Sequence, residues 1–276
     1  MTLAELISST TQLYSMPDVY FRVKALVDDP DAGMADLAKV IGADPGLTAR
    51  LLKLANSAYF GMPARVDSVA KAVNLLGMQQ VHDLVLATSV TQTFAQVPSL
   101  AMDMQLFWRR SLHAGVLARQ LAVACNMLDG ERLFVAGLLH DIGHLLMYQA
   151  APAQALAAQV QAKRDEMALF RVERALLGFD YAQAGAALMR SWNLPLALQE
   201  AVELHPEPAR AESFPRETSL LHIAARLADH ALPGGANEAG IDPVVWNVLG
   251  LEPSALASIQ DEAKSQLALV TSLIMS

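Results

Sequence analysis

Apolar residues recur along this chain at the spacing of amphipathic helices. Leu47, Leu51 and Leu54 form one stripe, and similar stripes run through residues 69–76 and 107–121. One side of a helix returns every three to four residues, so these stripes predict helices with one buried face. No segment alternates strictly between apolar and polar residues, and we therefore expect no β-sheet.

Short polar side chains indicate where several helices begin. Asp44, Ser68 and Asp180 each stand directly before a helical run, and Asp242 precedes Pro243. A side-chain oxygen at such a position accepts a hydrogen bond from a free N–H of the first turn, and proline is tolerated in that turn. These helix-start signals, together with the apolar stripes, predict roughly a dozen short helices joined by short loops.

Two stretches rich in helix-breaking residues suggest boundaries. The stronger lies at residues 232–242 and the weaker at residues 96–103. The segment after the first of these ends in an apolar run at residues 267–274. That run could pack on the core or contact a second copy of the chain in a homodimer.

Composition narrows the class of protein. Ala and Leu supply about a third of the residues, which favours helix, and 53% hydrophobic content argues against disorder. No apolar run approaches the ~18 residues of a membrane span, and we see no signal peptide. The net charge of −8 disfavours nucleic-acid binding, and a single cysteine, Cys125, suits a reducing, cytoplasmic compartment.

The candidate chemistry centres on a His-Asp pair in an apolar segment. Residues 132–148 follow one helical pattern, and His140 and Asp141 stand side by side within it. A buried carboxylate needs a counter-charge or a metal ion, and imidazole and carboxylate are both metal ligands. Adjacent helical residues point about 100° apart, so other helices would have to complete a metal site. His113 and Asp229 are the candidates for that role.

The predicted ligand set is therefore His113, His140, Asp141 and Asp229, for a divalent ion such as Fe, Mn, Mg or Zn. Two readings without a metal stay open. The His-Asp pair could be a structural hydrogen-bonded pair, and His113 and Asp229, taken singly, are typical of core and helix-end residues.

Residues 35–56 resemble a helix-turn-helix. Thr48, Arg50, Lys53 and Asn56 could face a DNA groove. The alternative, which we favour, is a simple helical hairpin within a bundle, because the aspartates clustered at residues 28–44 would repel phosphates. No specific nucleic-acid partner is expected.

Six segments in register resemble the bacterial HDOD domain. They are residues 44–60 (DPGLTARLLKLANSAYF), 72–77 (AVNLLG), 136–143 (AGLLHDIG), 178–188 (GFDYAQAGAAL), 192–195 (WNLP) and 201–206 (AVELHP). The resemblance implies an all-α fold, in which an N-terminal helical bundle packs on a part similar to the HD superfamily of phosphohydrolases. The resemblance covers roughly residues 10–210. Together with the two boundaries suggested above, it predicts residues 1–100 for the bundle, 101–232 for the HD-like part and 233–276 for a C-terminal helical extension.

The resemblance also implies a function. It points to a regulator of bacterial signal transduction that acts mainly by binding other signalling proteins, with a metal site that could be retained. The alternative is a metal-dependent phosphohydrolase, because His113, His140, Asp141 and Asp229 match the metal ligands of the HD superfamily. In that alternative His144 and His205 are the catalytic candidates, since imidazole can move a proton near neutral pH.

The chain departs from related cyclic-dinucleotide phosphodiesterases. They carry a lysine where this chain has His144 and a histidine where it has Tyr181, and no Gly-Tyr-Pro motif follows here. A centre with two or three metal ions is therefore not expected. For binding a phosphate group, Arg109, Arg110 and Arg119 are the nearest candidates.

Overall fold

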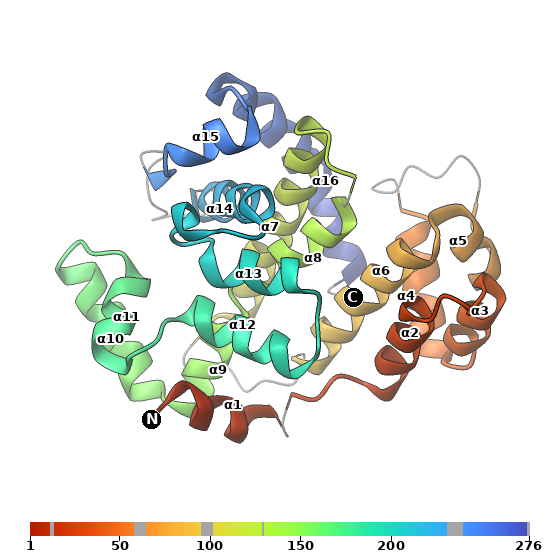
Figure 1. Ribbon diagram of the computed structural model, residues 1–276, viewed down its shortest axis with the longest axis horizontal. Helices are drawn as coiled ribbons and strands as arrows, with labels where there is room; N and C mark the ends of the chain where they lie inside the picture. Colours follow the sequence, from red (N-terminus) through yellow and green to blue (C-terminus); the bar gives the residue numbers. More distant parts are fainter. Residues whose placement is uncertain (12–13, 58–64, 95–101, 129, 231–239, 275–276) are drawn as a thin grey trace. The chain divides into compact units, whose positions relative to one another are not determined.

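All regular secondary structure in the described part of the chain is helical. The computed structural model describes residues 1–11, 14–57, 65–94, 102–128, 130–230 and 240–274. Within these ranges there is no strand, which confirms the predicted all-α class (Figure 1). No helix in these ranges has both the length and the apolar character that crossing a lipid bilayer requires. The predicted boundaries at residues 96–103 and 232–242 lie mostly outside the described residues.

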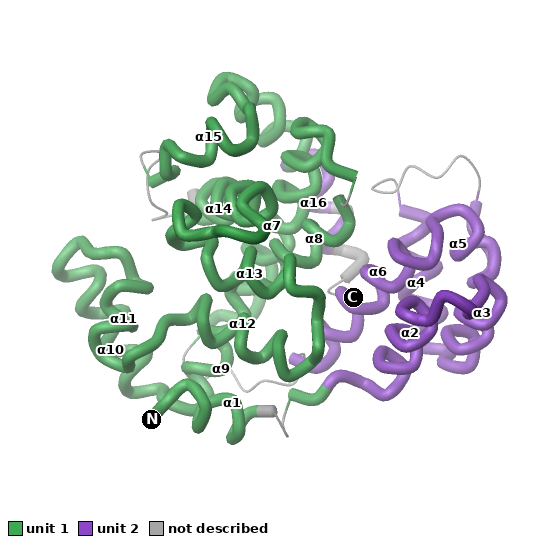
Figure 2. The backbone as a smooth tube through the Cα atoms, viewed as in Figure 1, with its two compact units in different colours: residues 1–15, 97–263 green, residues 16–96, 264–276 purple. Residues whose placement is uncertain are grey.

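The chain forms two compact units (Figure 2). The bundle unit consists of Met16–Gln96 and Lys264–Ser276, and the larger unit of Met1–Ser15 and Val97–Ala263. The first fifteen residues thus belong with the larger unit rather than with the predicted N-terminal bundle. The reason is local packing: α1 (Leu3–Thr11) contacts helices of the larger unit, and the indole N–H of Trp192 donates to the Tyr14 carbonyl oxygen at 3.1 Å.

Within the described ranges, the bundle unit contains five helices and the end of a sixth. These are α2 (Asp18–Asp28), α3 (Met34–Gly42), α4 (Pro45–Ala55), α5 (Val69–Leu76), α6 (Met78–Thr93) and the last part of α16 (Leu256–Ile274). Two predicted helix starts are confirmed. Asp44 Oδ1 accepts the Leu47 N–H at 2.9 Å, and Ser68 Oγ accepts the Lys71 N–H at 3.2 Å.

The hairpin of α3 and α4 is tied to its own unit by residues that could have faced DNA. The Thr48 hydroxyl donates to the Ile41 carbonyl oxygen at 3.0 Å. The Asn56 side chain accepts the Val66 N–H at 2.7 Å and donates to the Val66 carbonyl oxygen at 2.6 Å. These two polar side chains therefore hold neighbouring backbone, as expected for a hairpin in a bundle.

The larger unit contains the His-Asp segment. After α1 its helices are α7 (Met104–Ala124), α8 (Gly130–Leu139), α9 (Ile142–Ala150), α10 (Pro152–Arg164), α11 (Leu169–Leu177), α12 (Tyr181–Ser191), α13 (Leu196–Leu204), the 3₁₀ turn η1 (Pro208–Arg210), α14 (Pro215–His230), α15 (Val244–Leu249) and the 3₁₀ turn η3 (Pro253–Ala255). Asp180 caps α12 as predicted: it accepts the Gln183 N–H at 2.8 Å, and the Gln183 side chain accepts the Asp180 N–H at 3.1 Å.

Glycines let the central helices of this unit approach closely. A β-carbon on Gly137 of α8 would lie 2.5 Å from the backbone of Gly115 in α7. A β-carbon on Gly143 of α9 would overlap the Tyr181 carbonyl oxygen and lie 2.7 Å from the Gly185 nitrogen in α12. Because backbone meets backbone at both places, no side chain can be inserted without moving a helix.

We expect Gly143→Ala to lower the free energy of unfolding by at least about 2 kcal/mol, because the added methyl group has to push α9 away from α12. Gly42→Ala is the matched control. Gly42 is an exposed helical residue whose β-carbon would meet nothing within 4 Å, so this change should be neutral or stabilising by up to about 1 kcal/mol. Urea unfolding of both variants measures the difference, and equal stabilities would contradict the close-contact argument.

Candidate functional site

The His-Asp pair lies at a break between two helices. One continuous helix was expected over residues 132–148, but α8 ends at Leu139 and α9 begins at Ile142, with His140 and Asp141 in the turn between them. Both side chains line the same cavity of about 130 Å³, and each residue is only 2% exposed.

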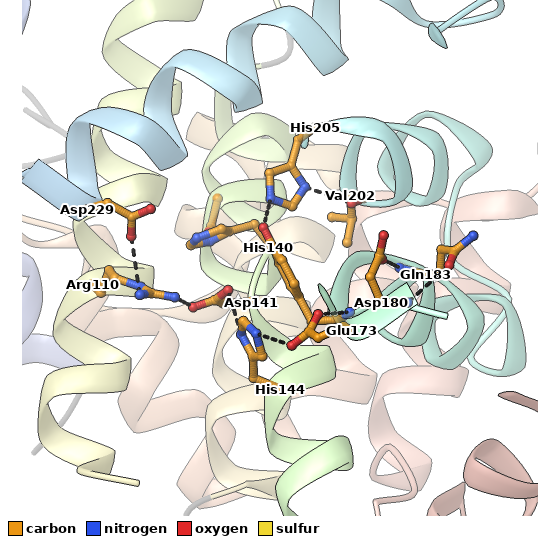
Figure 3. A network of polar contacts seen from close by, with 12 residues as sticks. Arg110, His140, Asp141, His144, Glu173, Asp180, Gln183, Val202, His205 and Asp229 are labelled. Carbon is orange, nitrogen blue, oxygen red and sulfur yellow. Dashed lines mark hydrogen bonds and ion pairs between the residues drawn. The ribbon is translucent and has the colours of Figure 1, made fainter. Parts of the chain in front are cut away.

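An arginine lies between the two aspartates of the predicted metal site (Figure 3). Arg110, from α7, forms an ion pair with Asp141 through Nη2 and a second with Asp229 of α14, at 3.2 Å through Nη1. Asp141 is buried, whereas the side chains of Arg110 and Asp229 are 29% and 32% exposed. The guanidinium charge therefore compensates both carboxylates at once.

A second series of contacts starts from the other carboxylate oxygen of Asp141. His144 Nδ1 lies 3.0 Å from Asp141 Oδ1, and its Nε2 lies 3.2 Å from Glu173 Oε1 (Figure 3). Glu173 Oε2 accepts the Tyr181 N–H at 3.0 Å. The His144 ring stacks on Tyr181 with 4.1 Å between ring centroids. His144 thus bridges two buried carboxylates and packs on α12.

His205 is held by two hydrogen bonds directly after α13. Its Nδ1 donates to the Val202 carbonyl oxygen at 2.7 Å, which leaves Nε2 to accept from the Tyr181 hydroxyl at 3.0 Å. Burial lowers the pKa of His205 well below its usual range, and neighbouring His140 acts in the same direction. Burial, with a smaller effect of Arg110, lowers the pKa of His140 to about 3. Both rings are therefore neutral at pH 7.

The structure brings most of the predicted site residues together. Five of them line the cavity of about 130 Å³, namely His140, Asp141, His144, His205 and Asp229. His113 is buried in α7, one turn beyond Arg110, and is not among the residues that line this cavity. Of the three arginines considered for phosphate binding, Arg110 lines the cavity. Arg226 of α14, which carries no motif, also lines it.

Two further residues that contact the site, Glu173 and His222, belong to no sequence motif. Glu173 occupies the buried face of α11, three residues after buried Phe170, so a charged residue in an apolar stripe was the available signal. His222 of α14 donates through Nδ1 to the His205 carbonyl oxygen at 2.6 Å and accepts the Asp242 N–H at 2.9 Å. Nothing in the local sequence marks His222.

The described arrangement does not fit a bound metal ion. Within the described ranges, no three His, Cys, Asp or Glu residues are arranged to hold one. Asp141 and Asp229 both face the Arg110 guanidinium, and Asp141 Oδ1 also contacts His144. A divalent ion between these carboxylates would have to displace the guanidinium group whose positive charge compensates both of them. The set His113, His140, Asp141 and Asp229 therefore stays a prediction.

Comparison with known proteins establishes the family. The model of the HDOD domain matches residues 13–208. The chain belongs to the HDOD domain family. A relative in Treponema pallidum (strain Nichols), an uncharacterized protein, is 26% identical over 196 residues. That alignment covers 69% of this chain and 37% of the Treponema protein, so this HDOD chain spans little more than a third of its curated relative.

Solved structures share the fold of this HDOD protein. A candidate phosphohydrolase from Shewanella amazonensis SB2B is 26% identical with a TM-score of 0.77, covering 98% of this chain and 97% of the other. A candidate signal transduction protein from Marinobacter aquaeolei VT8 is 25% identical with a TM-score of 0.73, covering 98% of this chain and 61% of the other. An HDOD domain protein of unknown function from Geobacter sulfurreducens, 20% identical with a TM-score of 0.81, covers 98% and 96%.

We expect Glu173→Ala to destabilise the HDOD protein by about 2–4 kcal/mol, because it removes the buried carboxylate that accepts the Tyr181 N–H and contacts His144 Nε2. Glu203→Ala is the control. Glu203 pairs with Arg190 at the surface, and loss of such a pair costs about 1 kcal/mol or less. Thermal and urea unfolding compare the two variants, and equal losses would show that the buried contacts of Glu173 contribute nothing.

We expect stability to fall as the pH is lowered from about 6.5 to 4. Burial lowers the pKa of His222 to about 4, so the unfolded chain takes up a proton in this range that the folded chain does not. The contribution of each such histidine to the free energy of unfolding is fully present above the pKa that the histidine has in the unfolded chain. Below that pKa the free energy of unfolding decreases by at most ~1.4 kcal/mol per pH unit for each such histidine. Urea unfolding at several pH values should give a smaller slope for His222→Gln, and an unchanged slope would refute the assignment.

Proposed function

We propose that this HDOD protein is a regulator in bacterial signal transduction that acts by binding other proteins. The observation that carries the proposal is the engagement of the two candidate proton carriers. His205 uses both ring nitrogens in hydrogen bonds within the protein, and His144 contacts a carboxylate through each of its own. Neither ring has a nitrogen left for a substrate, which supports binding rather than hydrolysis.

The comparisons with known proteins also support a role in signal transduction, without indicating a partner or a mechanism. The Marinobacter relative is described as a candidate signal transduction protein. The net charge of −8 favours regulatory or signalling proteins over nucleic acid as partners. We further propose a cytoplasmic location and leave a homodimer among the expected assemblies.

A second candidate function is a metal-dependent phosphohydrolase. Two observations favour it: His140, Asp141 and Asp229 line one cavity, and the Shewanella relative is described as a candidate phosphohydrolase. In this case His144 and His205 would be the proton carriers. It requires Arg110 to release both carboxylates and each histidine to release a partner.

Hydrolysis assays decide between the two functions. Purified protein is incubated with p-nitrophenyl phosphate, bis-p-nitrophenyl phosphate, nucleotides and cyclic dinucleotides, each with Mn²⁺, Mg²⁺, Zn²⁺ or anaerobic Fe²⁺. We expect no turnover that distinguishes the wild type from Asp141→Asn, because the histidines stay engaged. Glu203→Gln, a surface change, controls for handling. Turnover that is lost in Asp141→Asn and kept in Glu203→Gln would overturn the regulatory proposal.

A separate experiment tests binding. The tagged wild-type protein is purified from its source bacterium with and without a chelator, and the masses of the complexes are measured. We expect a stoichiometric complex with an identified signalling protein that persists in chelator. If the protein elutes alone, or only with itself, under both conditions, the partner-binding part of the proposal fails.

A further inference from the structure

The polar centre of the larger unit contains its own cation. Asp141, at the start of α9, and Asp229, near the end of α14, lie far apart in the sequence and meet at one guanidinium from α7 (Figure 3). Asp141 is 2% exposed, and a carboxylate buried to that extent is not tolerated without a compensating charge. Arg110 provides that charge.

We infer that Arg110 is a permanent internal cation that takes the place of a divalent metal ion between Asp141 and Asp229. A guanidinium group stays protonated at every pH at which proteins are folded, so its charge does not depend on metal supply. The inference goes beyond the proposed function. It concerns how two carboxylates are compensated, and it does not depend on which partner the protein binds.

Charge argues against both cations being present together. A divalent ion placed between the same two carboxylates would lie directly beside the guanidinium, and like charges in a largely buried site repel strongly. The remaining groups do not relieve this repulsion. His140 uses Nδ1 to contact the Gly137 carbonyl oxygen, and Arg226, which also lines the cavity, adds a second positive charge.

The same side chain also joins helices. Arg110 connects α7 to α9 through Asp141 and to α14 through Asp229. From Asp141 the contacts continue to His144, then to Glu173 on α11 and the first residue of α12. Removing the guanidinium should therefore loosen the unit and leave two uncompensated carboxylates facing one cavity, which is a setting that attracts a divalent cation.

Metal content and thermal unfolding test the inference on the full chain. Protein purified without chelator is analysed for bound metal, and its Tm is measured in EDTA and with Mn²⁺, Mg²⁺, Zn²⁺ or anaerobic Fe²⁺. We expect far less than one ion per wild-type chain and no change in Tm. Arg110→Ala should have a Tm lower by several degrees in EDTA, and at least one of the ions should restore part of the loss.

Two variants serve as controls. Arg110→Lys keeps a positive charge and should show a smaller loss and no metal response. Arg109→Ala alters the exposed neighbour on α7 and should behave as the wild type. One metal ion per wild-type chain would overturn the inference, as would an Arg110→Ala protein that keeps the wild-type Tm or responds to none of the ions. The wild-type measurement decides even if Arg110→Ala cannot be recovered as folded protein.

The outcomes separate this inference from the proposed function. Stoichiometric metal without hydrolysis would overturn the internal cation and leave the regulatory proposal standing. Hydrolysis by metal-free wild-type protein would overturn the regulatory proposal and leave the internal cation standing.

Discussion

The polar centre of this protein depends on compensating one buried carboxylate. Asp141 is almost completely shielded from water, so its charge has to be balanced by groups that come from other helices. Arg110 balances one side and is itself shared with Asp229, whereas His144 contacts the other side and leads on to Glu173. Five helices, namely α7, α9, α11, α12 and α14, supply or anchor these groups. These contacts link the five helices around the centre of the larger unit.

The backbone meets the same requirement by a break and by close contacts. α8 ends before His140 and α9 begins after Asp141, and both side chains line one cavity. Gly143 then allows α9 to touch α12, which brings the His144 ring onto Tyr181 with 4.1 Å between centroids. The His-Asp-Ile-Gly motif therefore has a structural explanation in this chain: two residues supply the polar groups, and the glycine supplies the contact that positions His144.

Local features were predictable from the sequence. The helices, the capping roles of Asp44, Ser68 and Asp180, and the helical hairpin all depend on residues within a few positions of one another. The family resemblance indicated that residues 113, 140, 141 and 229 would meet, and three of these four do line one cavity. The helix break and the role of Arg110 were not predicted, because periodicity continues through residues 132–148 and a lone arginine carries no motif.

The sequence by itself determined the helical class, the family and the location of the polar centre, because spacing, capping and motif order are properties of the chain read in one dimension. Only the tertiary structure decided which groups neutralise one another. Arg110, Asp141 and Asp229 are separated by dozens of residues, and whether two carboxylates meet a guanidinium, a histidine or an open cavity depends on how three helices pack. Charge compensation acts through distance in space, and distance in space between remote residues is set by packing.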